Sequence, residues 1–261
     1  MISFILEIFN FFLYQPLINI LIFLYQVIPG QDFGIAVICL TILIRVLLYP
    51  VSAKGVKSQK IINDLQPEIK EIQKKYKDQK EIQVKKVLEV YKKAKISPFS
   101  AFVPLLIQLP VLIALYRVLW GVQTSEATKF LYSFITIPEK INLTFLNIID
   151  LSDTGFTKEV NGDSTFLIGG AIIIFSAAAA QFIQMKMMLA KKEKEKKKEK
   201  KDSSQEIAEN MQKQMVYFFP FLTLFILMRF PLAIALYWLV STLFSIGQQH
   251  IIFKNYKKSE N

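Results

Sequence analysis

The sequence is poor in the residues on which most enzyme sites depend. Cys39 is the only cysteine among 261 residues, which excludes an internal disulfide, a redox pair and a cysteine-based zinc site. His250 is the only histidine, which argues against a zinc hydrolase of the H-E-x-x-H type and against a Ser-His relay. Neither a Walker A loop nor a G-x-G-x-x-G motif occurs, so no nucleotide site and no other cofactor is predicted.

Charged residues are missing from long stretches of the chain. Hydrophobic residues make up 52% of it, 22 residues are Phe, and the charges lie in blocks between apolar runs. Runs of roughly 18 or more apolar residues are typical of transmembrane helices. The predicted fold class is therefore an all-α polytopic membrane protein, a bundle of five transmembrane helices. The predicted spans are 33–53, 98–121, 164–189, 213–229 and 231–253.

The basic residues predict the orientation of these spans. Of the 32 Lys and Arg, 13 lie in 54–97, 10 in 186–213 and 3 in 254–261, whereas 122–163 has 3 Lys against 6 acids. Five alternating spans place the three basic segments on one side, and the positive-inside rule makes that side cytoplasmic. We therefore expect a multi-pass membrane protein with its N-terminus outside and its C-terminus in the cytoplasm.

The segments between the spans have distinct patterns. Residues 1–32 favour a helix in the outer interface, with a sixth span as the alternative. Residues 54–97 carry two apolar seams separated by a polar turn at 76–80, which predicts a mobile cytoplasmic helical hairpin. We interpret 122–163 as an outer loop, 190–212 as a Lys-rich cytoplasmic loop, and 254–261 as a short basic cytoplasmic tail.

Arg45 is the most informative polar residue in the spans. It lies about 18 Å along a helix from Phe33 and about 13 Å from Lys54, too deep to reach bulk water by snorkelling. None of the five predicted spans contains Asp or Glu that could pair with it. An arginine at this depth indicates a hydrated cavity, backbone carbonyl partners or an anionic group brought by a substrate. By contrast, Arg117 lies near the outer end of its span and can snorkel.

Further polar residues fall on helix faces compatible with a shared hydrophilic groove, although ordinary interhelical bonding is the alternative. The spacing of three and four residues in the last span is the clearest of these patterns. The candidate groove residues are Arg45, Thr41, Gln108, Gln181, Trp238, Ser241 and Ser245.

Four stretches of the chain together resemble the YidC-type membrane insertases, a family with mitochondrial and chloroplast relatives. They are 34–50 with Arg45, the pair 65–68 and 88–91, 97–110, and 230–249 with Tyr237-Trp238. The resemblance implies a five-helix bundle whose groove opens to the cytoplasm and to lipid. It also implies that Arg45, Gln181 and Trp238 line that groove, and that the protein lies in the plasma membrane of a bacterium.

The function implied by the resemblance is insertion and folding of small membrane proteins without nucleotide hydrolysis. Nascent membrane proteins and lipids are then the expected partners, a Sec-type translocon is a candidate partner, and the basic hairpin and loop are candidates for transient ribosome contact. The alternative is an ion or solute transporter or channel, which usually shows intramembrane acids and internal repeats. An enzyme is not expected, because no catalytic constellation can be assembled.

Overall fold

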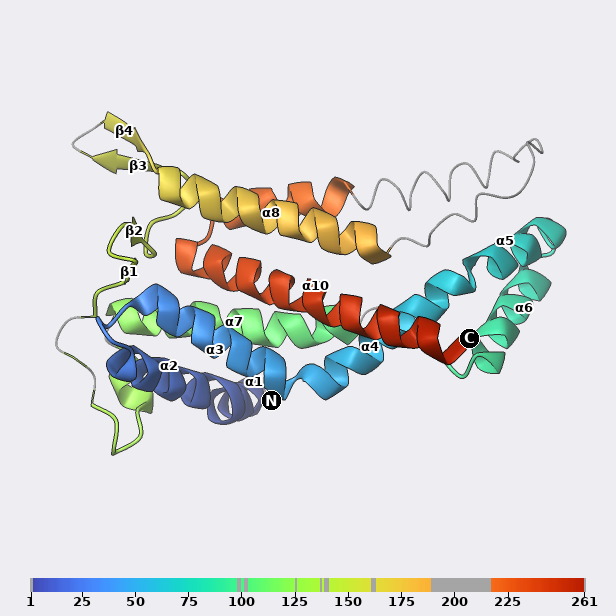
Figure 1. Cartoon of the computed structure of the whole chain (residues 1–261). Helices are drawn as coiled ribbons and strands as arrows, with labels where there is room; N and C mark the ends of the chain where they lie inside the picture. Colours follow the sequence, from blue (N-terminus) through green and yellow to red (C-terminus); the bar gives the residue numbers. More distant parts are fainter. Residues whose placement is uncertain are drawn as a thin grey trace.

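The protein is a bundle of long helices with short strands at one end and a pair of helices at the other (Figure 1). The computed structural model describes residues 2–97, 100, 103–124, 126–136, 138, 141–160, 163–188 and 217–260. The predicted Lys-rich loop 190–212 lies outside the described residues. The strands lie at the end predicted to be outside, and helices α5 and α6 at the end predicted to be cytoplasmic.

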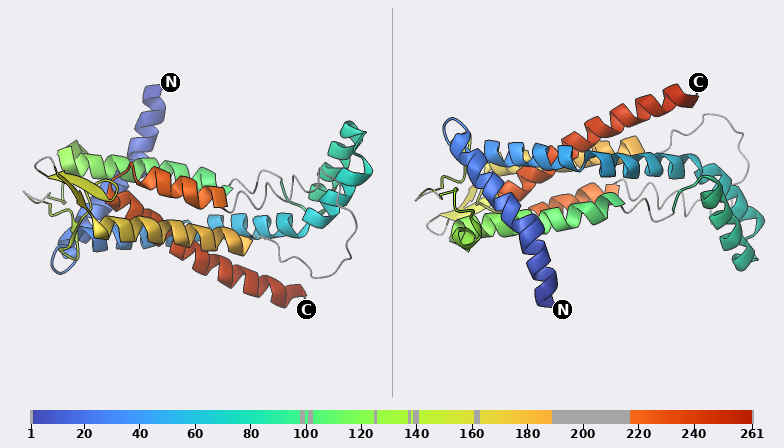
Figure 2. Two further views of the ribbon diagram at one scale, coloured as in Figure 1. Left: turned by 90° about the horizontal axis from the view of Figure 1, so that it is seen from above. Right: turned by 90° about the horizontal axis from the view of Figure 1, so that it is seen from below.

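The chain begins with a long helix that contains a π-helical segment. Helix α1 (Ile2–Phe9), η1 (Asn10–Tyr14) and α2 (Gln15–Val27) follow one another without a break. Pro16 has no N–H to donate, and the N–H of Gln15 reaches back five residues to the Asn10 carbonyl. Figure 2 shows this helix crossing the bundle obliquely. A long apolar helix is what both placements considered for residues 1–32 require, the interfacial helix and the further span.

The first predicted span, 33–53, contains a sharp bend. Helix α3 (Phe33–Leu47) starts at Asp32, whose carboxylate accepts from the Ile35 N–H at 2.9 Å, and α4 (Tyr49–Asp64) follows after Leu48. The two helices are bent by 68°. Pro50 explains the break, because its ring cannot donate to a carbonyl of the preceding turn and collides with it. Helix α4 then continues beyond the predicted span as a stalk.

Two short helices at the end of this stalk pack against each other. Helix α5 (Gln66–Lys75) and α6 (Lys80–Lys93) are separated by a turn at 76–79, and the Gln83 side chain donates to the Gln73 carbonyl at 2.8 Å. The first of the two apolar seams, from Ile62 to Tyr76, was expected to lie on one helix. The structure divides it between α4 and α5 at Leu65, because Pro67 lies in the first turn of a new helix.

The rest of the chain adds three long helices and the strands. Helix α7 (Val103–Thr124) is followed by η3 (Glu126–Phe130), β1 (Thr144–Phe145) paired with β2 (Ile149–Asp150), β3 (Thr157–Val160) paired with β4 (Asp163–Phe166), and α8 (Ile168–Met188). Both strand pairs are antiparallel. The helix Tyr217–Leu227 and α10 (Leu232–Glu260) complete the structure.

The fold is mostly helical as predicted, but the outer loop and the last helix differ from the prediction in detail. The outer loop contains two short β-hairpins that the apolar patterning did not indicate, because strands of two to four residues carry too little periodicity. Helix α10 continues through the predicted tail to Glu260, because the residues after 253 include neither Gly nor Pro to end it.

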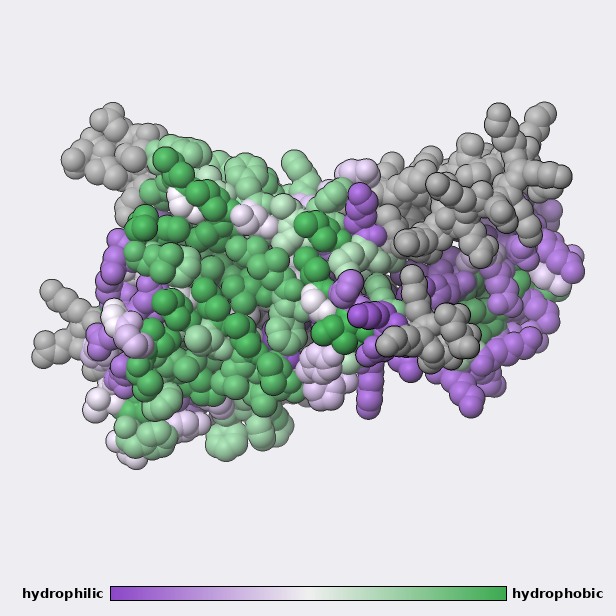
Figure 3. All heavy atoms as spheres, viewed as in Figure 1, coloured by the Kyte–Doolittle hydropathy of each residue, from purple (hydrophilic) through white to green (hydrophobic). Residues whose placement is uncertain are grey.

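The long helices are apolar enough for a multi-pass membrane protein. Within the described residues, Leu6–Val27, Ile168–Met188 and Leu232–Tyr256 are each long and apolar enough to cross a membrane, and the bent pair α3 and α4 would be a fourth span. Figure 3 shows hydrophobic residues covering the visible surface of the bundle, and hydrophilic ones gathering near α5 and α6. The five-span count remains a prediction.

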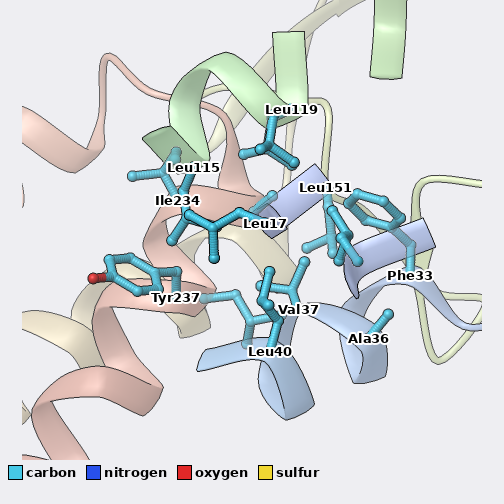
Figure 4. Close-up of a cluster of buried hydrophobic side chains, with 14 of the residues drawn as sticks. Leu17, Phe33, Ala36, Val37, Leu40, Leu115, Leu119, Leu151, Ile234 and Tyr237 are labelled. Carbon is cyan, nitrogen blue, oxygen red and sulfur yellow. The ribbon is translucent and has the colours of Figure 1, made fainter. Parts of the chain in front are cut away.

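A hydrophobic core is buried between the helices (Figure 4). Side chains from α2, α3, α7 and α10 meet there with Leu151 from the outer loop. The same loop satisfies the first backbone N–H groups of α10, since the Leu151 and Asp153 carbonyls accept from Ala233 at 3.0 Å and Leu232 at 2.8 Å. The outer loop is therefore part of the helix bundle and holds α10 in place.

Candidate functional site: Arg45 and the polar residues of α10

Arg45 lies where three helices meet. Its Nε donates to the Ser241 hydroxyl of α10 at 2.8 Å, and its Nη2 donates to the Gln108 amide oxygen of α7 at 2.8 Å. Nη2 also contacts the Ser241 hydroxyl. The structure thus brings together three residues that the sequence placed on separate spans.

The Gln108 amide is bound at both ends. Its oxygen accepts from Arg45, and its Nε2 donates to the Tyr237 hydroxyl at 2.8 Å. Tyr237 is 2% exposed and lies one turn before Ser241 on α10. Hydrogen bonds join Tyr237 through Gln108 and Arg45 to Ser241, and the turn of α10 between Tyr237 and Ser241 completes a ring of four residues, which we call the Arg45 ring.

The partners of Arg45 are neutral. Within the described residues, its hydrogen-bond acceptors are a hydroxyl and an amide, and Nη1 donates to none of them. The side chain is only partly exposed. Neutral acceptors orient a guanidinium group without cancelling its charge, so the Arg45 ring keeps a net positive charge inside the bundle.

Two of the predicted site residues lie one turn from this ring and bond to their own helices. Thr41 donates to the Val37 carbonyl at 2.6 Å, and Ser245 donates to the Ser241 carbonyl at 3.0 Å. Both side chains are buried. Their hydroxyl groups are satisfied locally, so they add polar surface beside Arg45 without a cross-helix bond.

The remaining two predicted residues form a separate pair. The Trp238 indole N–H donates to the Gln181 amide oxygen at 3.3 Å and joins α10 to α8. Trp238 follows Tyr237 directly, so the pair and the Arg45 ring occupy neighbouring faces of α10. The structure does not link them by a hydrogen bond within the described residues.

A second polar contact lies about two turns beyond Ser241 on α10. Gln248 donates to the Ser52 hydroxyl at 2.8 Å and to the Tyr49 carbonyl at 3.3 Å. The pairs Arg45 with Ser241 and Ser52 with Gln248 share the same sequence offset of 196. Helix α10 therefore runs in the same chain direction as α3 and α4, and its polar contacts with them lie seven residues apart.

Two buried amide oxygens continue this line of polar groups toward α5 and α6. Gln59 Oε1 and Gln249 Oε1 have no hydrogen-bond partner among the described residues. A cavity of about 260 Å³ lies at the opposite end of the bundle, where Thr154 and Arg229 are among its lining residues. The predicted groove beside Arg45 remains a prediction.

In the described part of the chain, no three His, Cys, Asp or Glu side chains gather into a cluster that could bind a metal ion.

Arg117 has partners inside the bundle, and its predicted ability to snorkel stays a prediction. It donates to the Asn10 side chain at 2.6 Å and lies over the Tyr14 ring at 4.7 Å, so it fixes the N-terminal helix to α7.

Tyr237 is the site residue that the analysis of polar residues missed. A tyrosine in a span is usually assigned to packing or to the interface, so the Tyr237 hydroxyl was not predicted to belong to the site. The available signal was its position four residues before Ser241, which places both side chains on one helix face.

Comparison with known proteins agrees with the structure. The family described as 60Kd inner membrane protein matches residues 23–260. The membrane protein insertases YidC of Francisella tularensis subsp. novicida (strain U112) and subsp. tularensis (strain WY96-3418) are each 30% identical over 227 residues. These matches cover 87% of this chain, which spans only 33% of the length of either relative.

A solved structure supports the fold. It is described as an active YidC insertase with its first transmembrane domain resolved, and it matches with a TM-score of 0.51 at 24% identity. The match covers 84% of this chain and 41% of the solved one. The match of residues 23–260 extends over nearly the whole sequence. The chain therefore belongs to the 60Kd inner membrane protein family, the family of the YidC membrane protein insertases.

Proposed function

We propose that the protein inserts small membrane proteins into the lipid bilayer and helps them fold, with Arg45 as the attraction point for acidic residues of the substrate. The observation that carries the proposal is the charge of Arg45 inside an apolar bundle, where its hydrogen-bond partners among the described residues are all neutral. Ser241 and Gln108 hold the guanidinium group in place, and its Nη1 is left to bind a ligand.

The chemistry at Arg45 favours a carboxylate. Two unit charges 4 Å apart attract by about 4 kcal/mol at the effective dielectric typical of a partly hydrated site. A neutral asparagine in the same place keeps the hydrogen bond but loses this Coulomb term. An acidic substrate tail is therefore retained at Arg45 while the rest of the substrate moves into lipid.

Release needs no nucleotide, because the substrate's own apolar span supplies the free energy. Burial of apolar surface contributes about 25 cal/mol per Å². The polar residues beside Arg45, Thr41 and Ser245 among them, line a groove that lets the tail leave bulk water partway. Gln181 and Trp238 form the neighbouring wall, and the two unpartnered amide oxygens of Gln59 and Gln249 mark its path toward the cytoplasm.

The surrounding segments have supporting roles in this proposal. Five spans place the N-terminus outside and the C-terminus in the cytoplasm, and residues 1–32 lie in the outer interface. The α5–α6 hairpin is mobile and recruits incoming chains, since Ile82, Val84 and Leu88 of α6 are exposed among lysines. Nascent membrane proteins and lipids are the partners, with a Sec-type translocon and transient ribosome contact as further candidates.

An ion or solute transporter is the rival function. Coupled transport usually relies on intramembrane acids, and the five predicted spans contain none. The neutral partners of Arg45 favour the insertase over this rival, because a transporter would be expected to neutralise its buried arginine with an acid.

The deciding experiment compares two reporters that differ in one substrate residue. A single-span protein carrying either Asp or Asn in its short tail is inserted by the wild-type protein, by Arg45→Ala and by Arg45→Lys. Insertion is normalised to the amount of folded insertase. We expect Arg45→Ala to reduce the Asp-to-Asn insertion ratio about tenfold, equivalent to about 1.4 kcal/mol, and Arg45→Lys to retain part of it.

Arg117→Ala is the matched control, because it removes an arginine that is already held by Asn10 and Tyr14. It should lower both reporters equally and leave the ratio unchanged. Equal losses for the Asp and Asn reporters in Arg45→Ala would make Arg45 a structural residue and refute the electrostatic mechanism.

A further inference from the structure

The Gln108 amide can bind Arg45 in only one of its two orientations. An amide oxygen accepts from a guanidinium group, whereas an amide NH₂ group opposes it donor to donor. In the structure the oxygen faces Arg45 at 2.8 Å, and the NH₂ group faces Tyr237. Arg45 thus selects the oxygen end of the amide, but the amide keeps its place beside Arg45 only if its NH₂ group is constrained as well.

The Tyr237 hydroxyl supplies that constraint. It accepts from Gln108 Nε2 at 2.8 Å, so both ends of the amide are bound, the oxygen to Arg45 and the NH₂ group to Tyr237. At 2% exposure the Tyr237 side chain is enclosed by the core, so water is not at hand to replace its hydroxyl.

We propose that Tyr237 is a positioning residue that fixes the Gln108 amide with its oxygen toward Arg45, and thereby keeps Arg45 Nη1 directed to an acidic group of the substrate. The inference rests on the proposed function and adds to it the residue that sets the preference for carboxylates. Tyr237 does not touch the substrate. It acts through Gln108 alone.

The number of free N–H donors on the Arg45 guanidinium group determines which ligand the site prefers. Nε and Nη2 of Arg45 are engaged by Ser241 and Gln108, so one side of the guanidinium group remains for the ligand. A site of this shape suits one carboxylate at a time. Without the Tyr237 hydroxyl, the Gln108 NH₂ group would lose its partner, the amide would no longer be held in place beside Arg45, and the preference for an acidic tail would weaken.

Tyr237→Phe tests this inference with the Asp and Asn reporters. It removes one oxygen from the ring and leaves the charge of Arg45 untouched. The Asp-to-Asn insertion ratio should fall roughly threefold to tenfold, the range expected for one hydrogen bond in a buried site. A variant that folds poorly lowers both reporters together, so the ratio still reports the position of Arg45.

Tyr25→Phe is the matched control. Tyr25 is 1% exposed, and its hydroxyl accepts from the Asn142 N–H at 3.0 Å, away from the Arg45 ring. This variant loses a buried hydroxyl of the same kind and should leave the ratio as in the wild type. A fall as large as that in Tyr237→Phe would assign the effect to general loss of packing and overturn the inference.

A double-mutant cycle supplies the second test. Since Tyr237 acts through Gln108, Tyr237→Phe should change the ratio in the wild-type background and have no effect on it in the Gln108→Leu background. Additive effects would overturn the inference. Its failure is distinguishable from that of the proposed function: a wild-type ratio near one refutes attraction by Arg45, and a high ratio that survives Tyr237→Phe refutes only the role of Tyr237.

Discussion

Gly170 at the start of α8 allows a strong test of how the outer loop and α10 are held together. A Cβ atom added at Gly170 would lie 2.6 Å from the Gly155 carbonyl oxygen and 3.1 Å from Leu232. The oxygen would have to withdraw by about 0.8 Å to reach the ordinary contact distance of 3.4 Å. Gly170→Ala is therefore expected to destabilise the protein although alanine is the better helix former.

The Gly155 carbonyl has little freedom to withdraw. Gly155 has a positive φ of 66°, and a Cβ there would meet the Met228 carbonyl at 3.2 Å. Asp153, two residues earlier, is bound through its carbonyl to the first turn of α10. Overpacking of this kind costs about 1–3 kcal/mol, from which the gain in helix propensity of about 1 kcal/mol is subtracted.

Gly247→Ala is the control that removes the propensity term. Gly247 lies in the interior of α10, and an added Cβ would meet no atom within 4 Å. The same gain in propensity applies to both variants, so the difference between them isolates the steric cost. The free energy of unfolding, measured by detergent titration in mixed micelles, should be lower in Gly170→Ala by about 1–3 kcal/mol. Equal stability of the two variants would refute the close packing of α8 on the loop.

Three further expectations concern topology, the hairpin and the N-terminal helix. In a Cys39→Ala background, cysteines at Lys75 and Lys257 should be labelled only from the cytoplasmic side and one at Thr154 only from outside; outside labelling at Lys75 would reverse the orientation. Backbone amides of α5 and α6 should exchange hydrogen much faster than those of α3 and α10, and equal rates would contradict a mobile hairpin. Asn19→Leu should lower the free energy of unfolding by about 1–3 kcal/mol. Asn19 is buried, donates to the Phe130 carbonyl at 2.8 Å and accepts from the Tyr132 N–H at 2.7 Å, so the variant leaves two backbone groups unpaired. A neutral effect in the same titration would contradict this.

The sequence predicted a multi-pass membrane protein and an arginine inside an apolar span, because both depend on composition along single helices. Arg45 stood out as a charge in an apolar run, and helical spacing put Ser241 and Ser245 on one face of α10. The direct partners of Arg45 could not be assigned from spacing. They depend on the relative rotation of α3, α7 and α10, which packing determines.

The parts that were missed have different physical causes. Pro50 causes the bend at Leu48. The bend was not predicted, because a proline near the expected end of a span was not interpreted as a helix break. The outer loop that carries the strands is bound to α10 through the carbonyls of Leu151 and Asp153. Such tertiary contacts leave no periodic signal in the sequence. Tyr237 was missed because one side chain serves packing with its ring and the Arg45 ring with its hydroxyl.

The constant offset of 196 residues has a consequence for how the protein itself is made. Arg45 enters the membrane early in synthesis, and its partner Ser241 follows 196 residues later. At a translation rate of about 5–20 residues per second, this interval lasts roughly 10–40 s. During that time the guanidinium group has no α10 to hold it. The nascent chain must shelter its own arginine with lipid headgroups, water or another insertase, so a protein proposed to help others across the bilayer has the same need during its own biogenesis.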